Sequence, residues 1–500
     1  MKGGIGALLS ERARVSRDME GLVDLAGGER LSFADLDAMS DRFVAALAAS
    51  VAPGERIALL AGNSHRYAAA VFAAAKLGAI LVPLNWRLTV PELAYQIEDC
   101  EPVVLLHDEA NAATARALYA DGTPPRLLSL ESLEGSATGA GQQPQARPIS
   151  GEDGFLILYT SGTTGRPKGA LHTHGSSLAW CASTIASFDN RFGDRQLLVA
   201  PLFHIAGICV LLNAVHRGFT LVVAPGFDAG EVWRTIETER ITSMFAVPTM
   251  INMMREHENA SRFDHGTLRW IMCGAAPVPV TLIDIYAGMG IDIHQVYGST
   301  ESHGGIAVLP PAYAHSRKGS TGLPCFGVEL KVVDADRRDL GPGRRGELVT
   351  RGAHLFREYW RQPEETARSF QDGWFRLGDI GEADADGFIT ICDRSKDMII
   401  SGGENVYPAE IENVLMRSPH VLEVAVVGRP HKRWGEVPVA VVVPRPDAGT
   451  DAETVRAELA KLASTELARF KQPADYVIAQ TLPRNAAGKV QKHIIRSSLP

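Results

Sequence analysis

A short apolar run passes directly into a loop rich in glycine, hydroxyl groups and lysine. Residues 155–158 read Phe-Leu-Ile-Leu, which is typical of a buried strand, and residues 159–169 read Tyr-Thr-Ser-Gly-Thr-Thr-Gly-Arg-Pro-Lys-Gly. Glycines permit positive φ and a close approach to an anion, while main-chain N–H groups, hydroxyls and Lys168 supply donors. Because Pro167 precedes the lysine and a glycine follows it, the loop is not a Walker A loop. These residues predict a polyphosphate-binding loop; a polar surface turn is the alternative.

Strand and helix patterns alternate along most of the chain. At 500 residues the chain exceeds one ordinary core, so at least two domains are expected. Ser32 begins a capping-box pattern, with Asp35 in place of the usual glutamate, ahead of an amphipathic helix. Alternating strands and helices are typical of a parallel α/β sheet. Further helices are expected over residues 67–77 and 91–100, and strands over residues 56–60, 79–83, 102–106, 196–200, 220–223, 243–246 and 268–273.

Several of the expected strands end beside polar or proline-rich loops. In open α/β sheets, ligands bind beyond the carboxyl ends of the strands. Four loops are therefore expected to form the walls of one crevice, and they cover residues 201–207, 247–249, 274–277 and 297–301.

The pattern changes in the last third of the chain. Residues 322–350 show short alternating strands and turns, which predict a small β subdomain. Residues 393–397 carry four charges in five positions and predict a hinge at Asp393. The roughly 105 residues beyond have their own α and β patterns, which is enough for a small domain. We expect a large N-terminal domain of parallel-rich sheets with flanking helices and the β subdomain over residues 1–392, and a small mobile α+β domain over residues 393–500.

Charge, cysteines and hydropathy exclude several classes of protein. A net charge of −8 argues against a general nucleic-acid binder. The six cysteines are far apart and favour reduced thiols in a cytoplasmic protein. The N-terminus shows no signal peptide. The apolar stretch 197–215 contains Pro201, His204 and Asn213, so we expect a strand, a loop and a core helix with no stable membrane insertion. The sequence carries no signal for oligomeric state, so it neither predicts nor excludes a homodimer.

Two further turns carry acids suited to nucleotide chemistry. In residues 297–301, Tyr-Gly-Ser-Thr-Glu, the ring of Tyr297 can pack on a base or acyl group and Glu301 can hold Mg²⁺ that bridges phosphates. Asp379 follows a glycine and could accept two hydroxyl hydrogen bonds from a ribose diol. Taken alone, either segment could equally be a structural turn.

Together these segments resemble the adenylate-forming superfamily, in its branch of acyl-CoA synthetases and fatty-acid–CoA ligases. The resemblance extends from the helix after Ser32 to Lys489. It implies that Lys489, in the Asn-x-x-Gly-Lys pattern, is the catalytic lysine and that Asp393 is the hinge. It also implies a catalytic set of Lys489, Glu301, Thr160 and His204, with Glu301 as the metal ligand and His204 as a gate to the carboxylate.

The resemblance further implies binding roles for ATP, coenzyme A and the acid. Gly402 and Gly403 would approach the pantetheine, and Trp434 and Phe470 would contact CoA, although packing is the usual role of an aromatic side chain. The expected nucleotide and CoA residues are Thr160, Ser161, Gly162, Thr163, Thr164, Gly165, Lys168, Gly274, Ala275, Ala276, Gln295, Tyr297, Gly298, Thr300, Asp379, Arg394, Gly402, Gly403, Trp434 and Phe470. The expected acid-binding residues are His204, Val247, Gly274, Ser299 and Gly305.

Two positions depart from the family pattern. Leu377 stands where a hydroxyl residue is usual two positions before Asp379, and Gln472 stands where some relatives have a basic residue near the CoA phosphate. The resemblance implies an ATP- and Mg²⁺-dependent carboxylic acid–CoA ligase that forms an acyl adenylate. Because the expected pocket carries no charge, a medium- or long-chain fatty acid is favoured over an aryl or hydroxycinnamate acid. Three less favoured functions stay open: a carrier-protein-loading adenylation enzyme, a luciferase-like oxygenase and a nucleotide-binding regulator without turnover.

Overall fold

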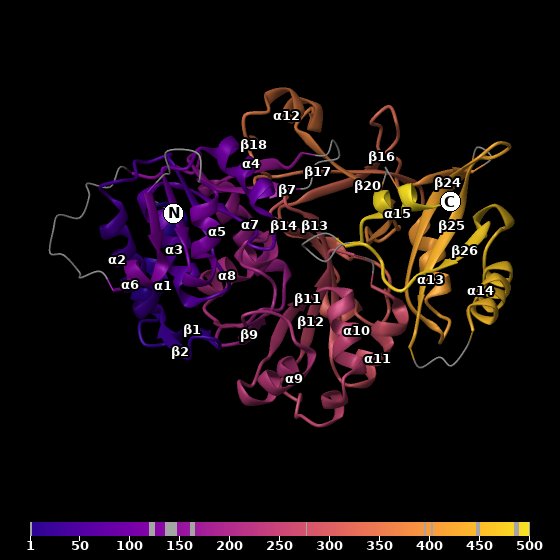
Figure 1. Ribbon diagram of the computed structural model, residues 1–500, viewed down its shortest axis with the longest axis horizontal. Helices are drawn as coiled ribbons and strands as arrows, with labels where there is room; N and C mark the ends of the chain where they lie inside the picture. The colour runs from indigo at the N-terminus through magenta and orange to yellow at the C-terminus, as the bar shows by residue number, and fades with distance from the viewer. Residues whose placement is uncertain are drawn as a thin grey trace.

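The computed structural model (Figure 1) describes residues 3–119, 126–135, 148–160, 166–276, 278–394, 397–401, 404–446, 451–484 and 490–499, with the side chain of Arg394 left undescribed. Two large sheets and two smaller ones form its framework. The helices are α1 Gly4–Val15, α2 Phe33–Leu47, α3 His65–Leu77, α4 Val90–Cys100, α5 Ala112–Ala117, α6 Leu130–Glu134, α7 His174–Ser187, α8 Ile205–Arg217, α9 Ala229–Thr238, α10 Pro248–Glu256, α11 Val280–Gly288, α12 Pro363–Ser369, α13 Pro408–Leu415, α14 Ala452–Glu466 and α15 Lys492–Ser498.

The largest sheet has nine strands, and its central pairings are parallel. A parallel centre requires helical crossovers, which agrees with the alternation in the sequence. In spatial order its strands are β15 Leu323–Pro324, β14 Gly304–Val308, β13 Asp292–Ser299, β12 Trp270–Gly274, β11 Ser243–Ala246, β9 Arg195–Leu198, β10 Thr220–Val223, β1 Glu20–Asp24 and β2 Glu29–Ser32.

The second large sheet has seven strands and carries the glycine-rich loop. Strand β7 enters the loop and β8 leaves it, and the two strands pair antiparallel with Thr160 opposite Lys168. In spatial order the strands are β18 Glu358–Tyr359, β8 Lys168–Thr173, β7 Gly154–Thr160, β4 Ile80–Pro83, β3 Arg56–Leu60, β5 Val104–His107 and β6 Arg126–Ser129.

Apolar side chains divide the large sheets and their helices into layers. One core contains α1, α2, α3, α7 and α8 together with residues from both large sheets, so these helices lie between the sheets. A second core packs α9, α10 and α11 on the outer face of the nine-stranded sheet, and another packs α4 and α5 on the outer face of the seven-stranded sheet. The expected α/β class with parallel-rich sheets is confirmed.

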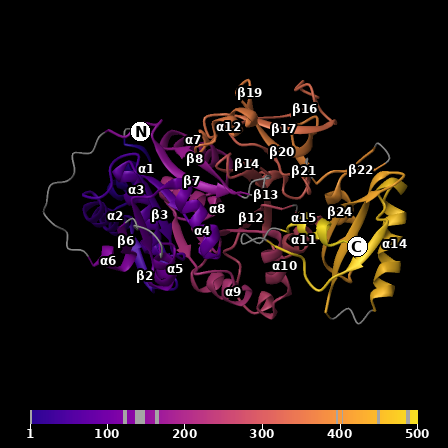
Figure 2. The ribbon, with the colours of Figure 1, turned by 45° about the horizontal axis from the view of Figure 1, so that its top comes forward.

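Two smaller sheets follow in the chain. The β subdomain contains β16 Glu329–Val333, β17 Arg345–Arg351, β20 Trp374–Ala383, β19 Phe370–Gln371 and β21 Ile389–Arg394. The last sheet contains β23 Glu404–Val406, β22 Ile399–Ser401, β25 Gly435–Pro444, β24 Val421–His431 and β26 Asp475–Ile478, with separate cores on its two faces. Both ribbon views place this yellow C-terminal part at the end of the molecule opposite the indigo N-terminal helices (Figures 1 and 2).

Several predicted elements agree with the structure. Ser32 caps α2, and the reciprocal bond with Asp35 is present. The apolar stretch 197–215 forms the end of β9, a loop and most of α8, as expected. No helix in the described ranges is both long enough and apolar enough to cross a membrane. Helix α1 and the return strand β8 are elements that the sequence patterns do not predict.

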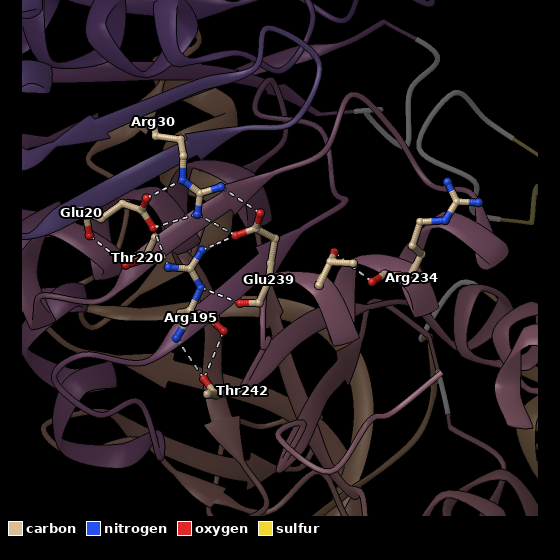
Figure 3. A network of polar contacts seen from close by, with 8 residues as sticks. Glu20, Arg30, Arg195, Thr220, Arg234, Glu239 and Thr242 are labelled. Carbon is tan, nitrogen blue, oxygen red and sulfur yellow. Dashed lines mark hydrogen bonds and ion pairs between the residues drawn. The ribbon is translucent and has the colours of Figure 1, made fainter. Parts of the chain in front are cut away.

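A network of ion pairs lies at the amino ends of several strands of the nine-stranded sheet (Figure 3). Arg30 contacts Glu20 at 2.7 Å and Glu239 at 2.9 Å, while Arg195 contacts the same two carboxylates. Glu20, Arg195 and Thr220 are each the first residue of a strand. The network therefore lies at the amino ends of the parallel strands, away from the edge where ligands are expected.

Candidate active site

Four polar loops lie along the carboxyl edge of the nine-stranded sheet. Strands β9, β11, β12 and β13 are consecutive neighbours and all pair in parallel. Their carboxyl ends therefore share one edge, and the loops after them begin at residues 199, 247, 275 and 300. The described residues of the four predicted loops therefore lie along one edge of the sheet, as the pattern of strands predicts.

Glycines allow two of these strand ends to approach their neighbours closely. A Cβ on Gly298 would lie 1.7 Å from the carbonyl oxygen of Gly304, and one on Gly274 would lie 2.5 Å from that of Val296. Side chains at these positions would separate β12, β13 and β14. Ala275 follows with φ of 68°, a region that L-residues other than Asn and Asp enter at a cost. Such outliers cluster at functional sites, and the expected nucleotide-binding role of residues 274–276 stays a prediction.

The described part of the glycine-rich loop consists of its two ends. Thr160 closes β7, and its hydroxyl lies 3.5 Å from the carbonyl oxygen of Lys168. Lys168 is buried, forms an ion pair with Glu365, and has its ammonium 5.3 Å from the centre of the Tyr359 ring. Ser161, Gly162, Thr163, Thr164 and Gly165 lie outside the described residues.

Glu301 lies just beyond β13 and accepts two hydrogen bonds from the segment that contains β18. Its Oε1 accepts a hydrogen bond of 2.9 Å from the Tyr359 hydroxyl, and its carbonyl accepts one of 2.8 Å from the Phe356 amide. Within the described ranges, Oε2 accepts no hydrogen bond. One carboxylate, together with substrate phosphates and water, is the usual set of Mg²⁺ ligands in nucleotide sites, so Glu301 fits that ion.

Tyr297 and Asp379 are in direct contact although they belong to different sheets. The Tyr297 hydroxyl donates to Asp379 Oδ2 at 2.6 Å. Asp379 is buried in β20, and its register partner in β21 is Arg394. Leu377 lies on the same face of β20 and packs into the apolar core of the β subdomain, which accounts for the missing hydroxyl there.

His204 lies at the start of α8 as its N-cap residue. Its Nδ1 accepts a hydrogen bond of 3.4 Å from the Ala206 amide, so the ring proton resides on Nε2. Burial lowers the pKa of His204 below its ordinary value, which keeps the imidazole neutral at pH 7. The structure places this neutral ring at the N-terminus of α8, and its gating role stays a prediction. Val247, the N-cap residue of α10, is half-buried along the same edge.

Ser299, Gln295 and Gly305 take part in backbone contacts. Ser299 and Ser302 exchange hydrogen bonds across the turn that follows β13. The Gln295 amide donates to the carbonyl of Ser320 at 2.7 Å inside the protein, which adds a structural contact to its predicted nucleotide role. The Gly305 carbonyl accepts a 3.0 Å bond from the Trp180 indole, so an aromatic side chain lies behind the predicted acyl wall.

Three buried histidines lie next to the turn that carries Glu301. The rings of His172 and His303 are nearly perpendicular with centroids 4.0 Å apart. Burial lowers the pKa of His172 to about 3 and that of His354 to about 4, and it lowers the pKa of His303 well below its ordinary range. All three are therefore neutral at physiological pH and place no positive charge beside the carboxylate.

The C-terminal candidates are described only in part. Gly402, Gly403 and the predicted catalytic Lys489 lie outside the described residues, as does the side chain of Arg394. Trp434 and Phe470 are 45% and 40% exposed, which excludes burial in the small core and leaves both rings accessible. The Gln472 amide donates to the Leu467 carbonyl at 3.0 Å. Asp393 Oδ2 accepts a 2.9 Å bond from the Ala409 amide at the start of α13, which ties the predicted hinge to the C-terminal part.

The sequence does not indicate that Tyr359 and Glu365 contact residues of the site. They contact Glu301 and Lys168, respectively, but lie in a short segment far along the chain. A two-residue strand and a seven-residue helix carry little periodicity, so the sequence contains no local signal for either contact.

The fold and the polar loops at the carboxyl edge of the nine-stranded sheet are those of a nucleotide-binding α/β enzyme. The chain belongs to the AMP-binding enzyme family, which matches residues 9–360, and the AMP-binding enzyme C-terminal domain matches residues 410–489. It is 39% identical to a long-chain-fatty-acid–CoA ligase of Mycobacterium tuberculosis over 98% of both chains. It is also 39% identical to a feruloyl-CoA synthase of an Amycolatopsis species, over 99% of this chain and 98% of the other. The o-succinylbenzoate coenzyme A synthetase of Bacillus subtilis, in complex with ATP and magnesium ion, superimposes with a TM-score of 0.87 at 31% identity over 99% of both chains.

Proposed function

We propose that this protein activates a carboxylic acid with ATP and transfers the acyl group to coenzyme A. The observation that carries the proposal is the end of β13, where Glu301 follows Tyr297 and Tyr297 is bonded to Asp379. A candidate metal ligand and a candidate ribose ligand are thereby fixed at one sheet edge, and Tyr359 connects Glu301 with Lys168, the residue that opens β8. The family relationship supports an acyl-CoA synthetase that forms an acyl adenylate.

The first step joins the acid to the α-phosphate of ATP and releases pyrophosphate. Mg²⁺ would be held through Glu301, and it would neutralise charge on the phosphates. We assign to Thr160 and the glycine-rich loop the orientation of the leaving pyrophosphate, and to Lys489 the stabilisation of negative charge at the α-phosphorus. His204, being neutral, would gate the acid without transferring a proton. In the second step the CoA thiol attacks the acyl carbon and AMP leaves.

The favoured acid is a medium- or long-chain fatty acid. The predicted acid-binding residues Val247, Gly274, Ser299 and Gly305 carry no charge, so an apolar chain suits them better than a second carboxylate. An aryl or hydroxycinnamate acid is the second candidate, because the feruloyl-CoA synthase matches this chain as well as the fatty-acid ligase does. A carrier-protein-loading enzyme is less favoured.

A substrate screen tests the function and separates the two acids. Short-, medium- and long-chain fatty acids, cinnamates and benzoates are compared by kcat/KM for CoA-dependent AMP formation, with pyrophosphate release measured in parallel. We expect both products, with the highest kcat/KM on a fatty acid. A preference for cinnamates would select the aryl acid, and pyrophosphate release with no CoA-dependent AMP formation on any acid would contradict the ligase assignment.

We further propose that the two steps use one crevice, with residues 393–500 rotating about Asp393 to present Lys489 and then the Gly402–Gly403 turn. Lys489→Ala tests this rotation. Adenylation should fall about a hundred- to thousandfold, because an electrostatic donor to the transition state is lost. Thioester formation from premade acyl adenylate should persist, whereas equal loss of both steps would refute the rotation.

Location and assembly are also proposals. All six cysteines are free and buried, which supports a cytoplasmic protein with reduced thiols. A homodimer is the assembly we propose, and sedimentation velocity measures it.

A further inference from the structure

A tyrosine outside the predicted site contacts two of its members. Tyr359 belongs to β18, which pairs with β8, the strand that leaves the glycine-rich loop. The ring is buried and packs edge-on against Phe356 with centroids 4.8 Å apart. Its hydroxyl reaches Glu301 Oε1 at 2.9 Å. The sheet that contains β8 thus also contacts the Glu301 carboxylate.

The face of the same ring meets the loop lysine. The ammonium of Lys168 lies 5.3 Å from the centre of the Tyr359 ring, within the range of a cation–π contact. Glu365 of α12 forms an ion pair with that ammonium. One aromatic side chain therefore contacts both the candidate metal ligand and the positive charge of Lys168.

Toward Glu301 the hydroxyl acts as the donor. An ionised carboxylate is a pure acceptor, so the proton of this 2.9 Å bond comes from the phenol. The bond occupies Oε1 and limits rotation of the carboxylate, so that Oε2 keeps a fixed direction. Partners of this kind behind a metal-binding group set its geometry.

We propose that Tyr359 is a positioning residue that aligns Glu301 for the Mg²⁺ that accompanies ATP. The proposal rests on the metal-binding role of Glu301 given above. A purely structural tyrosine would stabilise the fold and leave the dependence on metal concentration unchanged.

Tyr359→Phe is the informative change, because it keeps the ring over Lys168 and against Phe356 and removes only the hydroxyl. We expect the Mg²⁺ concentration that half-saturates pyrophosphate release to rise about tenfold or more, since loss of such a partner typically lowers metal affinity ten- to a hundredfold. The KM for the acid should change less than about twofold, since the hydroxyl bonds to Glu301, which is not among the predicted acid-binding residues. Binding of Mn²⁺, followed by electron paramagnetic resonance in the presence of a non-hydrolysable ATP analogue, should weaken by the same factor.

Tyr286→Phe is the matched control. The hydroxyl of Tyr286 is also buried and donates to the Ile251 carbonyl at 2.6 Å, but it lies in the outer layer of helices α10 and α11. This variant should lose thermal stability and keep normal Mn²⁺ binding. Glu301→Gln should weaken Mn²⁺ binding to the nucleotide complex at least as much as Tyr359→Phe does, because it alters the metal ligand itself.

Two results would overturn the proposal, and they differ in meaning. Normal metal dependence in Tyr359→Phe, with Mn²⁺ binding weakened in Glu301→Gln, would show that Glu301 binds metal without help from the tyrosine. Normal Mn²⁺ binding in Glu301→Gln would remove the metal role of Glu301 itself, and with it the basis of the proposal.

Discussion

The hydroxyl of Tyr297 joins the nine-stranded sheet to the β subdomain. It donates to Asp379 at 2.6 Å, and both residues are predicted to bind nucleotide. A carboxylate held by a short bond to a phenol keeps one orientation, and a diol that donates two hydroxyl hydrogen bonds needs an acceptor whose orientation is fixed. Tyr297 thus gains a role through its hydroxyl that the aromatic ring alone does not suggest.

Tyr297→Phe tests this role. We expect the KM for ATP to rise about tenfold with little change in the KM for the acid, because a hydrogen bond to a charged group contributes about 1.5–3 kcal/mol. Isothermal titration with AMP should show the same loss. In Tyr476→Phe, which removes a buried hydroxyl from the C-terminal sheet, nucleotide affinity should stay normal. Equal affinity for AMP in Tyr297→Phe and the wild type would rule out the positioning of Asp379.

At the level of single residues, the sequence predicts which side chains suit a chemical role better than it predicts which residues those side chains contact. Glu301 and Asp379 are singled out because carboxylates after glycine turns suit metals and diols. Lys168 is expected to face phosphates, yet its ammonium is paired with Glu365, which lies 197 residues further along the chain. Local spacing carries no information on such a distant partner, so the surroundings of Lys168 required the structure.

At the level of elements, predictability follows the length and regularity of each pattern. The strands at residues 220–223 and 243–246 have the predicted bounds, because short apolar runs between turns mark buried strands. The capping box locates the start of α2. Strand β18 has two residues and α1 opens with glycines, so neither shows a usable period. Pairing with β8 stabilises β18, and burial in the core between the two large sheets stabilises α1.

The ion pairs at the amino edge of the nine-stranded sheet predict a pH-dependent stability. Hydrogen bonds from Arg30 lower the pKa of Glu239 despite partial burial. A carboxylate whose pKa is lowered in the folded state stabilises the fold above its unfolded pKa, and this contribution is lost as pH falls through the folded value. Glu239→Gln should therefore lower the free energy of unfolding by about 2 kcal/mol at pH 7, the scale of a hydrogen bond to a charged group.

Urea unfolding between about pH 7 and pH 3 measures this effect. The difference between wild type and Glu239→Gln should shrink below the ordinary glutamate pKa of about 4.3, because the carboxylate of the unfolded state becomes protonated there while the folded state still holds it ionised. Glu11→Gln is the control, since the Glu11–Arg14 pair is largely exposed and surface pairs contribute about 0–1 kcal/mol. A difference that stays constant to the acid end of this range would refute the ionic origin of the stabilisation.

At the scale of the whole molecule, two ion pairs among the described residues connect the part before Asp393 with the part after it. Arg345 of β17 lies 3.6 Å from Glu410 of α13, and Arg445, just after β25, is paired with Glu256 at the end of α10. The Arg345–Glu410 pair lies close to the predicted hinge, where a rotation displaces atoms little. The Arg445–Glu256 pair is formed between segments that do not adjoin the hinge, so a rotation of residues 393–500 would break it.

Arg445→Gln therefore tests the coupling between domain orientation and the two chemical steps. If the orientation described here serves one step, loss of the pair should slow that step and speed the other, each by about two- to fivefold, because a partly exposed pair contributes about 0.5–1 kcal/mol. Single-turnover measurements of adenylation and of thioester formation from premade acyl adenylate give the two rates. Arg429→Gln removes an ion pair with Asp475 inside the C-terminal sheet and should leave their ratio unchanged. Since a shift in one equilibrium must favour one orientation at the expense of the other, a change of both rates in the same direction in Arg445→Gln would show that this contact does not control the rotation.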